Sequence, residues 1–124
     1  MPADTPRKKI LVIDDSPTVM QTLVLVLRSV GFHAAGEVSA ANGLKTAKLQ
    51  CPDILLCDIQ LDSTTGVALA LEILKSVPNC RVILMSGDTS STKTLADAHA
   101  RGQDFEVLAK PTPTDELLAL LGKP

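Results

Sequence analysis

Three acids, a serine and a lysine stand in this sequence immediately after short apolar segments. These residues are Asp14, Asp15, Asp58, Ser86 and Lys110. The first two are adjacent in the stretch ILVIDDSP, and no basic residue follows them until Arg28. Because neighbouring carboxylates repel each other, the pair needs a positive partner that the local sequence does not supply.

The types of these residues suit phosphoryl chemistry. Three clustered carboxylates favour a hard divalent cation, because oxygen-only ligands prefer Mg²⁺ or Mn²⁺. A lysine ammonium and a serine hydroxyl opposite such an ion would hold the remaining oxygens of a phosphoryl group. One carboxylate can itself be the nucleophile and form an aspartyl phosphate. The sequence therefore indicates Mg²⁺- or Mn²⁺-dependent phosphoryl transfer, provided that the fold brings these side chains together.

The apolar segments have the pattern of strands in a parallel sheet. Most are short and nearly continuous, which is typical of strands that are covered on both faces. They span residues 10–13, 54–57, 82–85 and 105–109, with the weaker segment 33–38 as a candidate edge strand.

Segments with helical spacing separate the strands. They span residues 17–30, 39–49, 65–76, 91–101 and 114–121. We expect Ser16 to cap the first helix, with Pro17 at its first position, and Gly31 to end it. Strand and helix alternate five times, so right-handed crossovers predict a doubly wound α/β sheet. Ligands bind such a sheet at the carboxyl ends of its strands, where the five polar residues lie.

Composition limits the classes of protein to consider. The chain has 124 residues, of which 45% are hydrophobic, and a formal net charge of −2. We expect a loose tail over residues 1–6 and one domain over residues 7–124.

The charge balance argues against nucleic-acid binding, and the basic cluster Arg7, Lys8 and Lys9 is interpreted as solvated charge beside a strand. The chain has no long apolar run and no signal peptide, which predicts a cytoplasmic protein without a membrane contact.

Taken together, the motifs resemble the receiver domain of response regulators, the phospho-accepting module of two-component signalling, over essentially the whole chain. The resemblance rests on the acidic pair in VIDDSP, Asp58 in ILLCDIQL, Gly66, Ser86 in VILMSG and Lys110 in LAKP. It implies a flavodoxin-like (βα)5 fold with strand order 2-1-3-4-5. It also implies a signalling module, not a conventional enzyme, that catalyses only its own phosphorylation and dephosphorylation.

The resemblance assigns the acids as follows. Asp58 is the phosphorylation site. Asp15 and Asp58 would bind Mg²⁺ directly, together with the backbone carbonyl of Gln60, and Asp14 would act mainly through a metal-bound water. The phosphoryl donor would be a histidine kinase or a phosphotransfer protein, and a downstream effector or a second copy of the chain is a candidate partner.

The resemblance also assigns Ser86 and Lys110, and it is incomplete at two other positions. Ser86 would contact the phosphoryl oxygens, Lys110 would pair with the phosphoryl group and a carboxylate, and the bond from Lys110 to Pro111 is expected to be cis. Asp62 stands where the family commonly has proline, and Val107 stands where it usually has tyrosine or phenylalanine. Output through a rotating aromatic ring is therefore in question.

The first helix carries apolar residues on more than one face, so we expect some of them to be exposed. Those residues are Val19, Met20, Leu23, Val24, Leu25, Val26 and Leu27. Such a patch beside the acids suits docking of a kinase or phosphotransfer helix. The other interpretation is that this wide apolar arc only packs against the sheet and neighbouring helices.

Two other functions are compatible with these residues. The first is a receiver-like interaction module that is not phosphorylated in the cell, which Asp62 and Val107 would favour. The second is a phosphatase of the haloacid dehalogenase type, which also uses an aspartate nucleophile after a strand. That class needs Asp-x-Asp after its first strand, whereas this chain has Asp14, Asp15 and Ser16 in succession. The adjacency of the acids therefore favours the phospho-accepting module.

Overall fold

Strands and helices alternate through the part of the chain that the computed structural model describes, residues 7–87, 91–110 and 113–122. The strands are β1 (Lys9–Ile13), β2 (His33–Glu37), β3 (Ile54–Asp58), β4 (Arg81–Ser86) and β5 (Glu106–Ala109). The helices are α1 (Pro17–Ser29), α2 (Ala40–Gln50), α3 (Gly66–Ser76), α4 (Ser91–Ala100) and α5 (Thr114–Leu121). Each predicted element is present, with bounds that differ by at most one or two residues.

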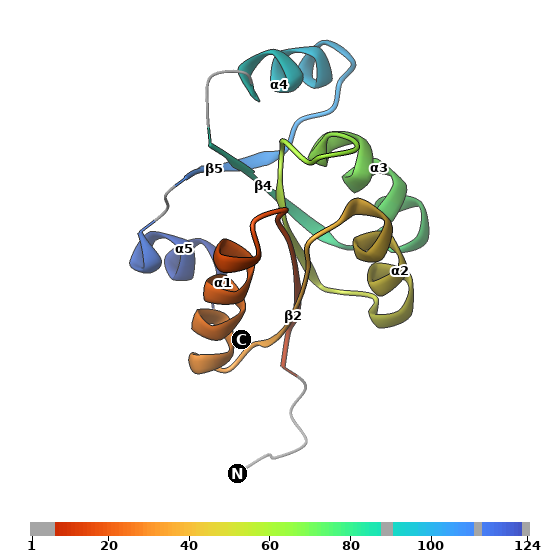
Figure 1. Ribbon diagram of the computed structural model, residues 1–124. Coiled ribbons are helices and arrows are strands. Elements are labelled where there is room, and N and C mark those ends of the chain that lie inside the picture. The colour runs from red at the N-terminus through yellow and green to blue at the C-terminus, as the bar shows by residue number, and fades with distance from the viewer. Residues whose placement is uncertain (1–6, 88–90, 111–112, 123–124) are drawn as a thin grey trace.

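The strands form one parallel sheet in the order β2-β1-β3-β4-β5, as Figure 1 shows. The predicted doubly wound fold and its strand order are therefore confirmed. Since the sheet is parallel, the carboxyl ends of all its strands meet at one edge.

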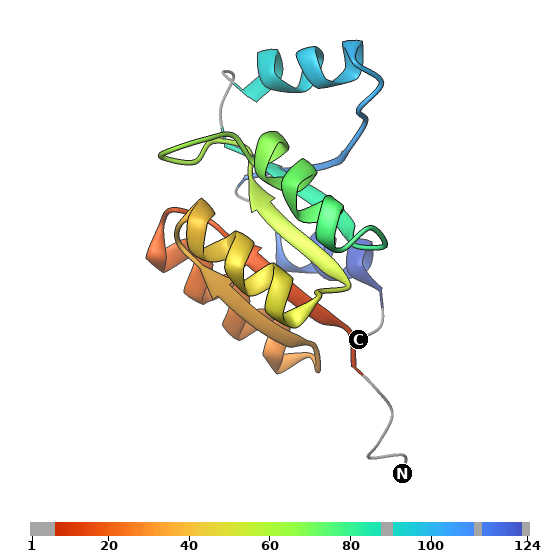
Figure 2. The same cartoon turned by 90° about the vertical axis from the view of Figure 1, so that its right-hand side faces the viewer.

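Alternate residues of the central strands pack on opposite faces of the sheet. Leu11 and Ile13 belong to the core beneath α2 and α3, whereas Ile10 and Val12 belong to the core beneath α1 and α5. The two helical layers lie on either side of the sheet in Figure 2. Burial on both faces explains the nearly continuous apolar runs.

The expectation of two-sided cover is wrong for β5. Glu106, Val107 and Ala109 are exposed. The helix α4 packs on α3 through the buried Ala98, and Figures 1 and 2 show it beyond the end of the sheet. The last strand is therefore left open on its outer side.

The predicted start of α1 is confirmed, and its apolar surface is divided between core and solvent. Ser16 caps the helix, since its Oγ accepts a hydrogen bond from the Val19 amide, and Pro17 is the first helical residue. Val24 and Leu27 are buried, whereas Leu25 is 66% exposed. Some apolar residues of this helix thus pack in the core, and others lie at the surface.

Two further expectations concern residues that the structure does not describe. The tail at residues 1–6 and the peptide bond to Pro111 fall outside the described residues. Within the described part of the chain, no helix combines the length and apolar character that crossing a membrane requires.

Gly66 fixes how closely α3 approaches the end of β3. Its amide donates a 2.7 Å hydrogen bond to the Ile59 carbonyl. A Cβ atom at this position would overlap the backbone oxygen of Asp58 and lie 3.0 Å from the Cα of Ile59. The residue must therefore lack a side chain for the Asp58 backbone to keep its position.

We expect Gly66→Ala to lower the free energy of unfolding by about 1–3 kcal/mol, because backbone atoms cannot move aside for the added methyl group without strain. Urea denaturation followed by circular dichroism measures the loss. Gly87→Ala is the matched control, since the nearest atom to its added carbon is the Lys110 Cδ at 3.8 Å. Equal stability of Gly66→Ala and the wild type would contradict this interpretation.

Candidate functional site

The register of the sheet brings the predicted site residues to one edge. Ile13 pairs with Cys57, which places Asp14 beside Asp58 one residue further along. Ser86, the last residue of β4, pairs with Ala109, so that Lys110 follows on the adjacent strand. Strand pairing thus brings the ends of β1, β3, β4 and β5, which the five residues chosen from the sequence occupy or follow, to one edge of the sheet.

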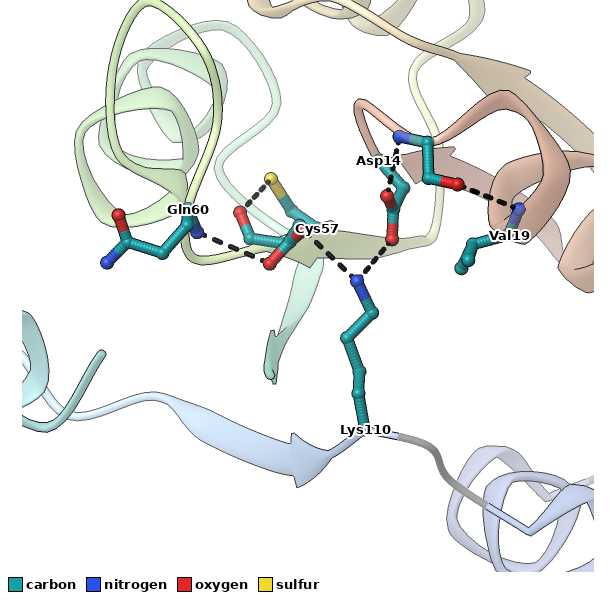
Figure 3. Close-up of polar contacts among 7 residues, drawn as sticks. Asp14, Val19, Cys57, Gln60 and Lys110 are labelled. Atoms are coloured by element: carbon teal, nitrogen blue, oxygen red, sulfur yellow. Dashed lines mark hydrogen bonds and ion pairs between the residues drawn. The ribbon is translucent and has the colours of Figure 1, made fainter. Parts of the chain in front are cut away.

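Lys110 links the two buried acids directly. Its Nζ lies 2.7 Å from Asp14 Oδ2 and 3.1 Å from Asp58 Oδ2. Figure 3 shows this side chain reaching from the end of β5 toward Asp14 across the sheet edge. Burial alone would lower the pKa of Lys110, but its contacts with Asp14 and Asp58 outweigh this effect and raise the pKa. The lysine is therefore the positive partner that the acidic pair lacked in the local sequence.

Asp14 is completely buried, and each of its oxygens has a partner. Its Oδ1 accepts a 2.9 Å hydrogen bond from the Ser16 amide, while Oδ2 is paired with Lys110. A buried carboxylate is tolerated only when it is paired and hydrogen-bonded, and both conditions are met here. Asp14 thus anchors the lysine and the start of α1 at the same time.

Asp58 ends β3 with its side chain partly open to the site. Its Oδ1 accepts a long hydrogen bond, 3.3 Å, from the Gln60 amide, and its Oδ2 is paired with Lys110. The side chain is 10% exposed. Hydrogen bonds and the neighbouring cation thereby orient this carboxylate without covering it fully.

Asp15 completes a cluster of three carboxylates. One oxygen each from Asp14, Asp15 and Asp58 can be chosen so that all lie within 4.8 Å of one another. This spacing and the all-oxygen donor set fit a hard divalent cation such as Mg²⁺ or Mn²⁺. The three carboxylates predicted from the sequence are therefore brought together by the fold.

Asp62, noted in the sequence only as a departure from the family pattern, contacts Asp15. Burial raises the pKa of Asp15, and a hydrogen bond from its side chain to that of Asp62, together with the charges of Asp62, Asp58 and Asp14, raises it further. The loop after β3 therefore brings a fourth carboxylate to the cluster. Sequence spacing could not predict this contact, because the direction of the loop decides it.

The remaining residues near the acids have distinct roles. The Ser86 carbonyl accepts a 2.8 Å hydrogen bond from the Lys110 amide, which joins β4 to the start of the next loop. The neighbouring Cys57 is buried, and burial, followed by the charges of Asp58 and Asp14, raises the pKa of its thiol. Cys57 therefore stays protonated and acts as a core residue.

A groove of about 500 Å³ opens beside Lys110. It is lined by Thr18, Val19, Thr22 and Leu23 of α1 together with Met85, Gly87 and Lys110. The lining is mostly apolar, and it leads from the surface of α1 to the lysine. A partner segment seated there would reach the acids from the α1 side.

Comparisons with known proteins agree on one family. The sequence profile of the family described as "Response regulator receiver domain" matches residues 10–122. The DNA-binding response regulator MtrA of Mycolicibacterium smegmatis is 27% identical over 116 residues, which cover 94% of this chain and 50% of that protein. The chemotaxis protein CheY of Thermotoga maritima is 28% identical over 119 residues, 94% of this chain and 96% of that protein.

Solved structures give the same result. A response regulator receiver domain protein from Clostridium thermocellum has a TM-score of 0.78 and 29% identity, and the match covers 89% of this chain and 87% of that one. The chain spans about half the length of MtrA, which contains more than the matched region.

The contact between Asp15 and Asp62 makes a prediction for the metal-free protein. We expect Asp62→Asn to lower the pKa of Asp15 toward the ordinary aspartate value, because the variant removes one negative charge from the cluster. A carboxyl ¹³C NMR titration in chelator-treated buffer measures this change. Asp115→Asn, at an exposed position on α5, should leave the Asp15 titration as it is in the wild type. An unchanged Asp15 pKa in Asp62→Asn would show that the contact has no electrostatic effect.

Proposed function

Since the chain belongs to the response regulator receiver domain family, we propose that it accepts a phosphoryl group on Asp58 in a reaction that depends on Mg²⁺ or Mn²⁺. The observation that carries the proposal is the position of Lys110, whose Nζ bridges Asp14 and Asp58 beside a third acid. Receiver domains are signalling modules, and the proposal treats residues 7–124 as one such unit in the cytoplasm.

The transfer forms one bond and breaks another. An Asp58 carboxylate oxygen attacks the phosphorus of a phosphohistidine, and the bond from that phosphorus to the donor nitrogen breaks. The nitrogen keeps the electron pair, and the imidazole takes a proton from solvent. With acetyl phosphate as donor, acetate leaves in place of the imidazole.

Lys110 and Ser86 would stabilise the transferred group. The lysine already lies against Asp58 Oδ2, so a phosphoryl group on this carboxylate would place oxygens within reach of its ammonium. Ser86 ends the neighbouring strand and would offer its hydroxyl to another oxygen. Donors that are held in place before the reaction stabilise developing charge without reorganisation.

Asp15, Asp58 and the Gln60 carbonyl would hold the divalent ion, and Asp14 would contact it through water. Both oxygens of Asp14 already have protein partners, which supports an outer position for this acid. When bound, the ion neutralises charge on the carboxylates and on the phosphoryl oxygens.

The phosphoryl donor would be a histidine kinase or a phosphotransfer protein. The groove between α1 and Lys110 supports this, since it offers an apolar surface that ends at the acids. A downstream effector or a second copy of the chain would then recognise the phosphorylated form.

Incubation with acetyl phosphate and Mg²⁺, followed by intact mass measurement, tests the proposal. We expect one added phosphoryl group on the wild type and none on Asp58→Asn, and the addition should disappear with chelator. An unchanged wild-type mass would contradict the proposal. It would favour the alternative of an unphosphorylated interaction module, for which the extra charge of Asp62 beside Asp15 is the specific observation.

A substitution in the groove tests the route of the donor. We expect Thr22→Arg to slow transfer from a phosphohistidine donor protein by about tenfold, which corresponds to roughly 1.4 kcal/mol of lost binding. Thr22 is exposed and lines the groove, so the larger side chain should obstruct docking without entering the core. Phosphorylation by acetyl phosphate should not change.

Gln21→Arg, at the next and also exposed position of α1, is the matched control for Thr22→Arg. It adds the same charge outside the groove and should leave both reactions at wild-type rates. Equal rates of protein-dependent transfer for Thr22→Arg and Gln21→Arg would exclude docking in this groove.

A further inference from the structure

A cavity of about 580 Å³ lies at the opposite end of the sheet from Asp58. It is formed by the starts of β1 and β2 and by the ends of α1 and α2. Figure 1 shows the end of α1 leading into β2 at the lower end of the molecule. Its lining residues are Arg7, Lys9, Arg28, Phe32, His33, Ala34, Ala35 and Gln50. The volume is within the range that small-molecule sites occupy.

The charge of this cavity differs from that of the whole chain. Arg7, Lys9 and Arg28 line it together with His33, and no acidic side chain of the described residues does so. The formal net charge of the protein is −2. Positive charge is therefore concentrated here against the overall balance.

None of these cations has a carboxylate partner in the part of the chain that the structure describes. The Asp53 carboxylate accepts a 2.8 Å hydrogen bond at Oδ2 from the Lys9 backbone amide, not from the Lys9 side chain. The side chains are held by neutral backbone groups. Arg28 Nε donates to the Ala34 carbonyl at 2.9 Å, and Lys9 Nζ donates to the Gln50 carbonyl at 3.3 Å.

This arrangement positions charge without neutralising it. Because the Arg28 guanidinium is fixed through Nε, its terminal amino groups stay available for a planar, bidentate contact with a phosphate. Lys9 uses one donor of three on the protein. Phe32 and Ala34 are largely buried and also line the cavity, which gives it an apolar floor.

We propose that this cavity binds a small nucleotide, with Arg7, Lys9 and Arg28 on its phosphate groups and the apolar floor beneath its base. Three cations gathered in one hollow match two or three adjacent phosphates. A nucleic acid or a lipid surface would instead need basic residues spread over an extended face. The proposal is independent of Asp58, since the cavity lies at the amino ends of the strands.

Titration of the ¹⁵N-labelled chain with ADP tests the proposal, in magnesium-free buffer that contains a chelator so that no cation links ADP to the acids. We expect saturable amide shifts at residues 7–9 and 32–35, with a dissociation constant below about 1 mM. Arg7→Gln and Arg28→Gln should each weaken binding by about tenfold, the usual effect of losing one charged hydrogen bond.

One control variant tests whether the effect is specific to the cavity. Lys45→Gln removes an exposed cation of α2 that does not line the cavity and should bind ADP as the wild type does. Arg7 has no hydrogen-bond or ion-pair partner in the described part of the chain, so its substitution tests binding without a risk to folding.

Several outcomes would overturn the proposal. Shifts that do not saturate, or equal weakening by Lys45→Gln, would show that ADP only senses overall charge. Inorganic pyrophosphate bound as tightly as ADP would exclude a nucleotide site. Binding of a short oligonucleotide or of anionic phospholipid vesicles, with no binding of ADP, would assign the surface to a macromolecular partner.

Discussion

Repulsion among carboxylates at one edge of the sheet is the constraint on which this structure depends. Parallel pairing of β1 with β3 places Asp14 beside Asp58, and Asp15 adds a third charge. Lys110 supplies the opposite charge, because the pairing of β4 with β5 places it at the same edge. An ammonium between two buried acids offsets part of their charge. A divalent ion would offset more, and a phosphoryl group would then give the lysine a further anion to bind.

The residue that usually transmits the signal from this edge to a partner in the family is not aromatic in this chain. No tyrosine is present in the chain, and Val107 occupies the position of the expected aromatic residue. It is exposed on β5, and α4 packs on α3 and leaves the outer side of that strand open. Because this position carries no aromatic ring, a signal from Ser86 would have to reach a partner without ring rotation.

Much of this could be predicted from sequence, because its signals are local or repeat along one element. Ile10–Ile13 is apolar throughout since both faces are buried, and Ser16 and Pro17 mark a helix start by their own chemistry. The contact of Asp62 with Asp15 depends on the path of a loop, which no periodicity encodes. The open β5 depends on where α4 packs. The basic cavity is formed by four segments that are far apart in the sequence. From the sequence alone, Arg7 and Lys9 are therefore interpreted as ordinary solvated charge.

A crystal structure with Mg²⁺ and beryllium fluoride, which mimics a phosphoryl group, would show whether Asp58 accepts a phosphoryl group beside a bound ion. We expect beryllium bonded to an Asp58 oxygen and Mg²⁺ bound by Asp15, Asp58 and the Gln60 carbonyl. We also expect Lys110 Nζ to contact a fluoride. Beryllium fluoride bound away from Asp58, or Lys110 left between the two acids with Mg²⁺ elsewhere, would show that Asp58 is not the phosphoryl acceptor of this site.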